Sequence, residues 1–365
     1  TEIYTLSLHD ALPICVSEPD TLAGYAEGPN YFKYGFENAY PFIRAMGNYL
    51  PDGYTSVTFG STTRSIRNPW FDDRYDRICD WMNRIRMPDG SSPAIHDSYA
   101  GFGTTITALS GKPRFNLMNP GFTPNELMIR SQYIATHIPH GEITDSLFQP
   151  LPAAGSLVFR SSWLPDAIYM HFIGKHGIAL TGAKAHHQGD ASSFSIAARG
   201  QLLAVDPGYP GASQASLTNK AEDHSLILVN GNGPQPPSGE LVSTSTNTAY
   251  IEHYFDTPMV GYGEVRVSYS GAEIIRRNLF VRKRYFLLAD FVSSSSSKTY
   301  TWQLHGHGLA GGDPASPQGA YYPDYSHQQG WYRRDTVTLV VRVTTPGSAP
   351  AFTHTTDSMA IAGGF

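Results

Sequence analysis

The interpretation of this chain starts from one segment, Ala185–Gly211, which reads AHHQGDASSFSIAARGQLLAVDPGYPG. It contains two short runs typical of β-strands, Ser193–Ala198 and Leu202–Val205, with Gly200 in the turn between them. Two histidines and an aspartate precede the first strand, and a second aspartate follows the second strand. This segment carries the densest signal of functional chemistry in the chain.

On both sides of this segment, from Pro139 onward, short β runs alternate with turn residues. The other candidate strands are Gly155–Arg160, Ala167–Ile173, Ser225–Val229, Ala249–Tyr254, Glu264–Tyr269, Ile274–Val281, Tyr285–Phe291, Tyr300–His305 and Thr336–Val343. Ser293–Ser297 is predicted to be a hairpin tip, and Gly308–Gln328 a longer loop. No convincing helix interrupts the strands, which predicts antiparallel sheets packed as a large β-sandwich.

The chain upstream of Pro139 has a helical pattern instead. Phe71–Arg86 places Tyr75, Ile78, Cys79, Met82 and Ile85 on one apolar stripe, which predicts an amphipathic helix. Further helices are expected over Tyr31–Leu50 and Thr123–Ile138, and a loop over Pro88–Gly101. The predicted fold class is therefore a multidomain α+β protein, with a helical domain followed by a β-sandwich domain.

Composition narrows the classes of function. At 365 residues, two domains are the natural expectation, and a net charge of -5 without any basic run argues against nucleic acid as a partner. Tyr (22) and Phe (18) are plentiful, which suits an aromatic cleft for sugar rings. The two cysteines, Cys15 and Cys79, give no disulfide framework. No apolar run is long enough for a membrane span, no signal peptide is visible, and the oligomeric state stays open.

The segment Ala185–Gly211 resembles the signature of heparinase II/III-like polysaccharide lyases, in which a His-x-His-x-Asp-x-x-Ser-Phe run leads into a strand and a later strand ends in Leu-Val-Asp-x-Gly. The matching residues are Asp190, Ser193, Phe194, Gly200, Leu203, Val205, Asp206 and Gly208. Four more segments resemble the family in its order, namely YAEGPNYFKYGF from Tyr25, GSLVFRSSWLPDAIYMHF from Gly155, DHSLILVNG from Asp223 and RRNLFVRKRYFLLADFV from Arg276. Together they cover most of residues 25–310.

The resemblance implies a partial (α/α) toroid-type helical domain over residues 17–145 and a heparinase II/III-like β-sandwich domain over 146–365. Thr1–Cys15 is similar to the translation of a sequencing adapter, so residues 1–16 are expected to be a non-native leader. Relatives hold the uronate carboxylate with an Asn element on a helix before the Tyr motif. We therefore expect an N-terminally truncated chain without that element, which leaves it inactive if the truncation is real. Localisation would be periplasmic or secreted.

The reaction that the resemblance implies is β-elimination beside a uronic acid, which requires neutralisation of the carboxylate, removal of the C5 proton and protonation of O4. Tyr31 matches the catalytic tyrosine of the family, and Tyr34 is the alternative three residues along the same helical face. A phenol is protonated at neutral pH and suits the acid role. His186 matches the first histidine of the signature and has the right chemistry for a base.

The remaining expected site residues bind substrate or metal. His187, Arg160 and His96 are candidates for substrate contact. In zinc-containing relatives a second histidine, the Asp of the Val-Asp-x-Gly element and a later histidine bind the metal; Asp206 and His224 match, but Gln188 stands in the histidine position. Glutamine is a poor zinc ligand. No cofactor is therefore expected for the chemistry, and structural zinc is the alternative.

The sequence thus predicts a carbon–oxygen lyase that acts on an acidic polysaccharide or oligosaccharide. Two alternatives from other classes stay open. One is a non-catalytic glycan-binding protein of the same fold. The other is a glycoside hydrolase, which needs two carboxylates across the cleft, and Glu27 and Asp97 are the helical-domain candidates.

Overall fold

The computed structural model describes residues 24–99, 146–181, 186, 188–235, 247–316, 318–347, 350–351 and 353. These residues form a β-rich protein with the helices α2 (Pro29–Tyr49), α3 (Asp73–Ile85) and the short α5 (Gly177–Thr181). Turns of 3-10 helix lie at η1 (Pro69–Phe71), η4 (Pro152–Ala154), η6 (Ala212–Leu217), η7 (Ala221–Asp223) and η8 (Tyr325–His327). None of the described helices is long and apolar enough to cross a membrane.

Two antiparallel sheets dominate the fold. The five-stranded sheet has the order β3 (Phe148–Leu151), β4 (Ser156–Arg160), β5 (Tyr169–Ile173), β6 (Phe194–Ala198), β7 (Gln201–Ala204). The four-stranded sheet has the order β12 (Tyr285–Ser294), β11 (Ala272–Val281), β10 (Val260–Tyr269), β9 (Ala249–Asp256). In each sheet, strands adjacent in sequence pair side by side, so the chain advances by antiparallel hairpins.

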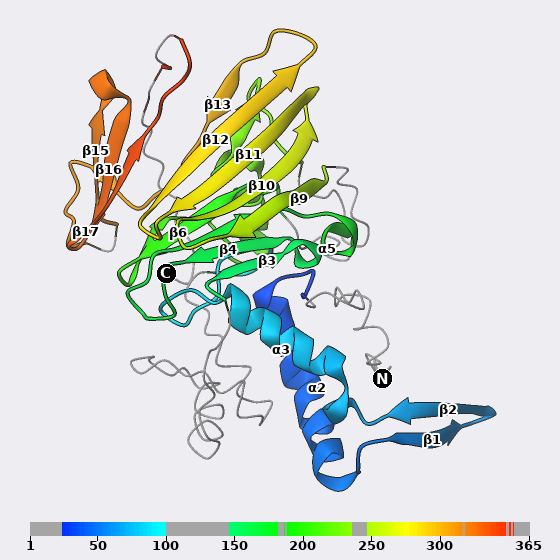
Figure 1. The fold of residues 1–365 in the computed structure, drawn as a ribbon. Helices are drawn as coiled ribbons and strands as arrows, with labels where there is room; N and C mark the ends of the chain where they lie inside the picture. The colour runs from blue at the N-terminus through cyan, green and yellow to red at the C-terminus, as the bar shows by residue number, and fades with distance from the viewer. Residues whose placement is uncertain are drawn as a thin grey trace.

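Smaller strand pairs complete the fold. They are β1 (Tyr54–Phe59) with β2 (Thr62–Arg67), β8 (Ile227–Val229) with β13 (Tyr300–Trp302), and the sheet of β14 (Leu309–Ala310), β15 (Ala320–Asp324), β16 (Gln329–Arg334) and β17 (Val337–Arg342). The β14–β15 pair is parallel and the other pairs are antiparallel. The β1–β2 hairpin projects from the body next to the helices (Figure 1).

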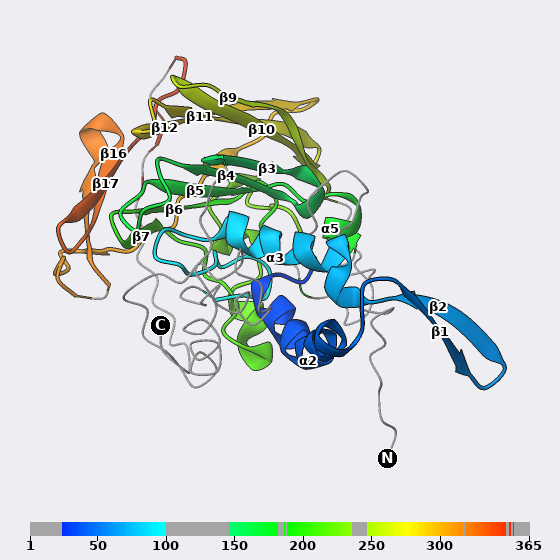
Figure 2. The ribbon, with the colours of Figure 1, turned by 60° about the horizontal axis from the view of Figure 1, so that its bottom comes forward.

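The main elements stack in three layers, seen edge-on in Figure 2. The five-stranded sheet lies in the middle, with α2 and α3 on one face and the four-stranded sheet on the other. Alternation along β4 explains this arrangement, because Val158 joins the core beneath the helices while Leu157 and Phe159 join the core between the sheets. Every residue of β4 and β5 is buried, as expected for strands covered on both faces, and the polar members Ser156, Arg160 and His171 have hydrogen-bond partners or ring contacts.

The helix α3 confirms the amphipathic prediction. All five residues of the predicted apolar stripe are buried, and the helix begins two residues after Phe71 and ends at Ile85. The helix α2 begins two residues earlier than predicted, because Gly28 takes a left-handed conformation (φ 89°) and Pro29 occupies the first turn. Both helices therefore bury one face against the middle sheet.

Several predictions were wrong in detail. The Tyr54–Arg67 hairpin lies where only helices and loops were expected, and the predicted loop Gly308–Gln328 contains β14 and β15. Ser293–Ser297 is not a hairpin tip, because Ser293 and Ser294 belong to β12, which pairs with β11, and the chain beyond them passes to β13, which pairs with β8. Strand partnership depends on contacts distant in sequence, so local turn residues do not reveal it. The predicted helix Thr123–Ile138 lies outside the described residues, and the toroid remains a prediction.

Candidate active site

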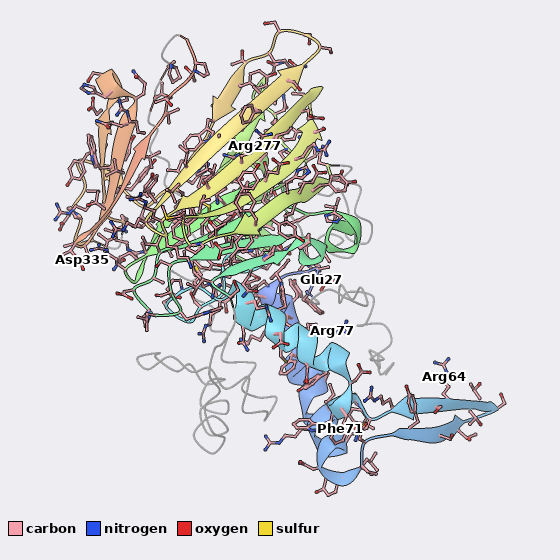
Figure 3. The ribbon with its side chains drawn as sticks, viewed as in Figure 1. Glu27, Arg64, Phe71, Arg77, Arg277 and Asp335 are labelled. Atoms are coloured by element: carbon pink, nitrogen blue, oxygen red, sulfur yellow. The ribbon has the colours of Figure 1, made fainter. Side chains whose placement is uncertain are left out.

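The candidate site lies where the helical layer meets the middle sheet. Glu27, just before α2, is at this junction in Figure 3. Three segments converge there: the start of α2, the loop Ile95–Ser98 and the segment that follows β7. Two glycines allow the approach, since a Cβ on Gly28 would come within 2.8 Å of the Ile95 carbonyl oxygen and one on Gly208 within 2.6 Å of the Ser98 carbonyl oxygen.

The structure brings Tyr31 and His186 together. Their ring centroids are 4.1 Å apart with an interplanar angle of 42°. Tyr31 is in the first turn of α2, and His186 precedes β6. Two side chains that are distant in sequence are therefore in contact in the structure, as the predicted mechanism requires.

Asp97 holds the other side of His186. The Nδ1 atom of His186 lies 2.8 Å from Oδ2 of Asp97, and the two side chains are 28% and 10% exposed. Burial raises the pKa of Asp97 above its ordinary value, against the opposing effects of the hydrogen bond and charge of His186 and the charge of Lys175. The sequence had marked Asp97 only as a hydrolase carboxylate. Its partner lies 89 residues away, which no local pattern could reveal.

Tyr31 is kept in its protonated form. Burial raises the pKa of its phenol, and the Tyr209 phenol and the carboxylates of Asp97 and Glu27 raise it further. Sequence reasoning missed Tyr209, although it stands in the quoted segment one residue after Gly208. Because a raised pKa favours the neutral phenol, Tyr31 is suited to donate a proton rather than to accept one.

A set of hydrogen bonds holds the loop Ile95–Ser98 to both neighbouring segments. The Gln188 side-chain amide donates to the carbonyl oxygens of His96 (3.0 Å) and Gly208 (3.2 Å). The backbone N–H of Tyr209 donates to the Ser98 carbonyl oxygen (2.8 Å), and the N–H of Asn30 donates to Ser98 Oγ (2.9 Å). The loop that carries Asp97 is therefore fixed from the β side and from the helix side.

The residues expected to bind a metal form a different arrangement. Asp206 Oδ2 lies 3.0 Å from His224 Nδ1, and Asp206 Oδ1 accepts a hydrogen bond from the Gly208 N–H. Burial acts to lower the pKa of His224, but the charge and hydrogen bond of Asp206 outweigh it and raise that pKa. Gln188 contributes its amide to the loop contacts above. In the described part of the chain, one group of His, Cys, Asp and Glu side chains lies close enough together to offer three ligands to one ion. The group consists of Glu252, His253 and Glu264, on β9 and β10.

A three-donor metal site built on Asp206 and His224 is therefore not formed by the described residues. Asp206 and His224 offer two good donors, and the Gln188 amide is already hydrogen-bonded to two carbonyl oxygens. This set falls short of the three protein donors that zinc usually needs. The Glu252–His253–Glu264 group also has other partners, since Glu264 bonds to His253, Tyr262 and Arg277, and Glu252 to Arg266. We assign no chemical step to a metal.

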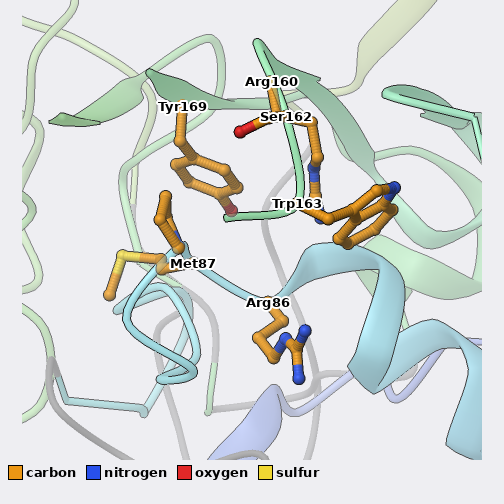
Figure 4. A pocket seen from close by; sticks show the side chains of 7 residues that line it. Arg86, Met87, Arg160, Ser162, Trp163 and Tyr169 are labelled. Atoms are coloured by element: carbon orange, nitrogen blue, oxygen red, sulfur yellow. The ribbon is translucent and has the colours of Figure 1, made fainter. Parts of the chain in front are cut away.

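The other predicted residues lie outside the Tyr31–His186 pair. Tyr34 is 66% exposed on α2. Arg160 donates to the Arg84 carbonyl oxygen (2.6 Å) at the end of α3 and stacks 3.7 Å from Trp163, beside a small cavity (Figure 4). These contacts satisfy a helix terminus, which is a structural role. His96 is buried with its backbone at φ 54°. His187 lies outside the described residues.

Comparisons with known proteins place this geometry in context. No protein-family model and no curated protein matches the sequence. Among solved structures, heparan sulfate lyase HepC from Pedobacter heparinus matches with a TM-score of 0.58 at 16% identity, over 87% of this chain and 44% of that one. A structure of heparinase III matches with a TM-score of 0.54 at 14% identity, over 74% of this chain and 41% of that one. Over the matched part, this chain has the fold of heparan sulfate lyase structures.

A second heparinase III structure gives the same result, with a TM-score of 0.52 at 18% identity, over 71% of this chain and 37% of that one. The suspected resemblance to the heparinase type is thus confirmed at the level of fold. The chain spans about two fifths of the length of these structures. Identities this low establish the fold alone, so the activity of this chain needs its own argument.

Proposed function

We propose that this protein is a polysaccharide lyase that cleaves a uronic-acid-containing glycan by β-elimination. The observation that carries the proposal is the side-by-side placement of Tyr31 and His186 at the junction of the helical layer and the middle sheet. An acid and a base that act on neighbouring atoms of one sugar must approach each other in this way. The fold shared with heparan sulfate lyases supports the same chemistry.

In the proposed reaction, Nε2 of His186 takes the C5 proton of the uronate. The electron pair of the C5–H bond forms the C4–C5 double bond, and the C4–O4 bond breaks. Tyr31 donates its hydroxyl proton to the departing O4, and the proton on His186 returns to Tyr31 through solvent. Its raised pKa keeps the Tyr31 proton in place until O4 becomes basic.

The proposal includes the finer predictions made from sequence. The domain boundaries near residue 145, the partial toroid, an acidic glycan as substrate and a periplasmic or secreted location follow from the resemblance. The group that neutralises the C6 carboxylate is expected on a helix before the Tyr motif. His186 and Tyr31 supply both proton transfers, so neither of these two steps uses a metal.

A panel of uronic polymers tests the proposal. Elimination creates a double bond conjugated with the carboxylate, so product release is followed by ultraviolet absorbance, and new reducing ends are counted in parallel. We expect both signals to rise together with at least one polymer, using the full-length protein. Reducing ends without absorbance would indicate a hydrolase, and binding of the polymer without either signal would indicate a glycan-binding protein.

A further inference from the structure

We propose that Asp97 is a positioning residue that fixes both the orientation and the tautomer of His186, so that Nδ1 carries the proton and Nε2 serves as the base. This inference rests on the proposed lyase function. The observation behind it is the contact of 2.8 Å between His186 Nδ1 and Asp97 Oδ2, which joins residues of the two layers.

The chemistry of this contact decides the tautomer. An ionised carboxylate only accepts hydrogen bonds, so the imidazole nitrogen facing it must carry the hydrogen. A neutral imidazole has one protonated nitrogen, and the other is then the acceptor of a proton. With Nδ1 turned to Asp97, Nε2 is the basic atom, and the carboxylate stabilises the imidazolium formed after proton transfer.

Asp97 is held firmly enough to perform this role. The neighbouring His96 adopts φ 54°, an uncommon conformation for a residue with a side chain, and its carbonyl oxygen accepts a hydrogen bond from Gln188. Ser98, on the other side of Asp97, receives hydrogen bonds from Tyr209 and Asn30. The carboxylate is therefore fixed by bonds on both flanking residues, and its side chain is only 10% exposed.

The charged and titratable groups around this pair come from every adjoining segment. Tyr31 contacts the His186 ring from α2, and Glu27 precedes that helix. Tyr209 interacts with Tyr31 from the segment after β7, and the Lys175 charge acts on Asp97 from the end of β5. Of these groups, the Asp97 carboxylate lies within hydrogen-bonding distance of the His186 imidazole.

The test compares Asp97→Asn with Asp324→Asn as a matched control, using the full-length protein. Asp324 forms the same kind of pair with His327, also at 2.8 Å, on the exposed turn η8. Nitrogen NMR of histidine-labelled protein, with the His186 signals assigned by comparison with His186→Gln, reports which ring nitrogen carries the proton. In the wild type we expect the Nδ1–H form, and in Asp97→Asn a shift to the Nε2–H form. The control should leave the His186 signals unchanged.

Kinetics provide the second readout. We expect Asp97→Asn to lower kcat by roughly 100-fold or more while KM changes by less than about threefold, because the base is misplaced and not removed. Asp97→Ala should regain part of its activity with added formate and not with chloride. An Nδ1–H tautomer that persists in both Asp97→Asn and Asp97→Ala would overturn the inference, because alanine leaves no oxygen there to accept that hydrogen. A loss of kcat without any tautomer change would overturn it as well. If the wild type cleaves no uronic polymer, the lyase proposal fails, and the tautomer measurement still decides the role of Asp97.

Discussion

The phenol ring of Tyr31 lies 4.1 Å from the imidazole ring of His186, measured between centroids, although one residue belongs to helix α2 and the other to the segment before β6. This contact places a group suited to donate a proton beside a group suited to accept one. The two rings are too close for a sugar to fit between them, so we expect the acid and the base to act from one side of a bound sugar.

Tyr31→Phe tests the acid role. The substitution removes the hydroxyl and keeps the ring packing, so we expect at most about 1% of wild-type kcat with an unchanged melting temperature. Tyr34→Phe is the matched control three residues away, and it should retain nearly full activity because its side chain is mostly exposed. Full activity of Tyr31→Phe combined with loss in Tyr34→Phe would transfer the role to Tyr34.

The side-by-side placement predicts the stereochemistry of elimination. An acid and a base on one side of the sugar can remove H5 and release O4 only when both lie on the same ring face. We therefore expect mannuronate or glucuronate units to react at least about tenfold faster, in kcat/KM, than their C5 epimers guluronate or iduronate. Defined block polymers with a single uronate measure this, and equal rates on both epimers would contradict it.

A buried ion pair near the site is expected to control acid stability. Lys175 Nζ lies 2.7 Å from Asp190 Oδ1, and both side chains are almost fully buried. Burial acts to raise the pKa of Asp190, but the Lys175 ammonium lowers it to about 2. The resulting stabilisation, on the order of 2 kcal/mol, is present above the unfolded-state pKa near 3.9 and is lost as pH falls toward about 2. Urea unfolding at several pH values measures this loss.

Substitution at the same pair tests the cost of an isolated charge. Asp190→Asn leaves the Lys175 ammonium buried without its counter-ion, so we expect a loss of about 3–5 kcal/mol in unfolding free energy. The double variant Lys175→Met with Asp190→Asn removes both charges and should recover more than half of that loss. An equal loss in the single and double variants would show that packing, not charge, is responsible.

Gln188 is expected to stabilise the site through its two hydrogen bonds. Gln188→Ala leaves the carbonyl oxygens of His96 and Gly208 without this donor, so the unfolding free energy should fall by about 1–3 kcal/mol and kcat should fall with it. Gln235→Ala removes a comparable bond to a backbone carbonyl at an exposed position and should change little. Equal effects of the two substitutions would argue against a special role for Gln188.

Metal removal tests the proposal that the chemistry needs no ion. Because His186 and Tyr31 carry both proton transfers, incubation with a chelator should leave activity and melting temperature unchanged. Elemental analysis of the purified protein reports any bound metal directly. A fall in melting temperature with the chelator, reversed by zinc, would show that Asp206 and His224 bind an ion with a further donor.

The sequence by itself determined the elements with strong local periodicity. The apolar stripe of α3 and the alternating strands β10 and β11 are visible in single segments, because side chains that recur at the period of a helix or strand must share one face. The candidate-site segment before β6 and the Tyr31 motif were also identified from local patterns and the resemblance that they carry. These features need no knowledge of distant partners.

Only the tertiary structure decided which residues meet. Asp97 and Tyr209 gave no local sign of their contacts with His186 and Tyr31, and Gln188, expected as a poor metal ligand, instead joins two loops. Arg276, which begins one of the segments that carry the resemblance, is buried and bonded to Asp290 inside the sandwich. Such pairings depend on which faces of separate elements are brought together when the layers pack, and that choice is made by the whole core rather than by any one segment.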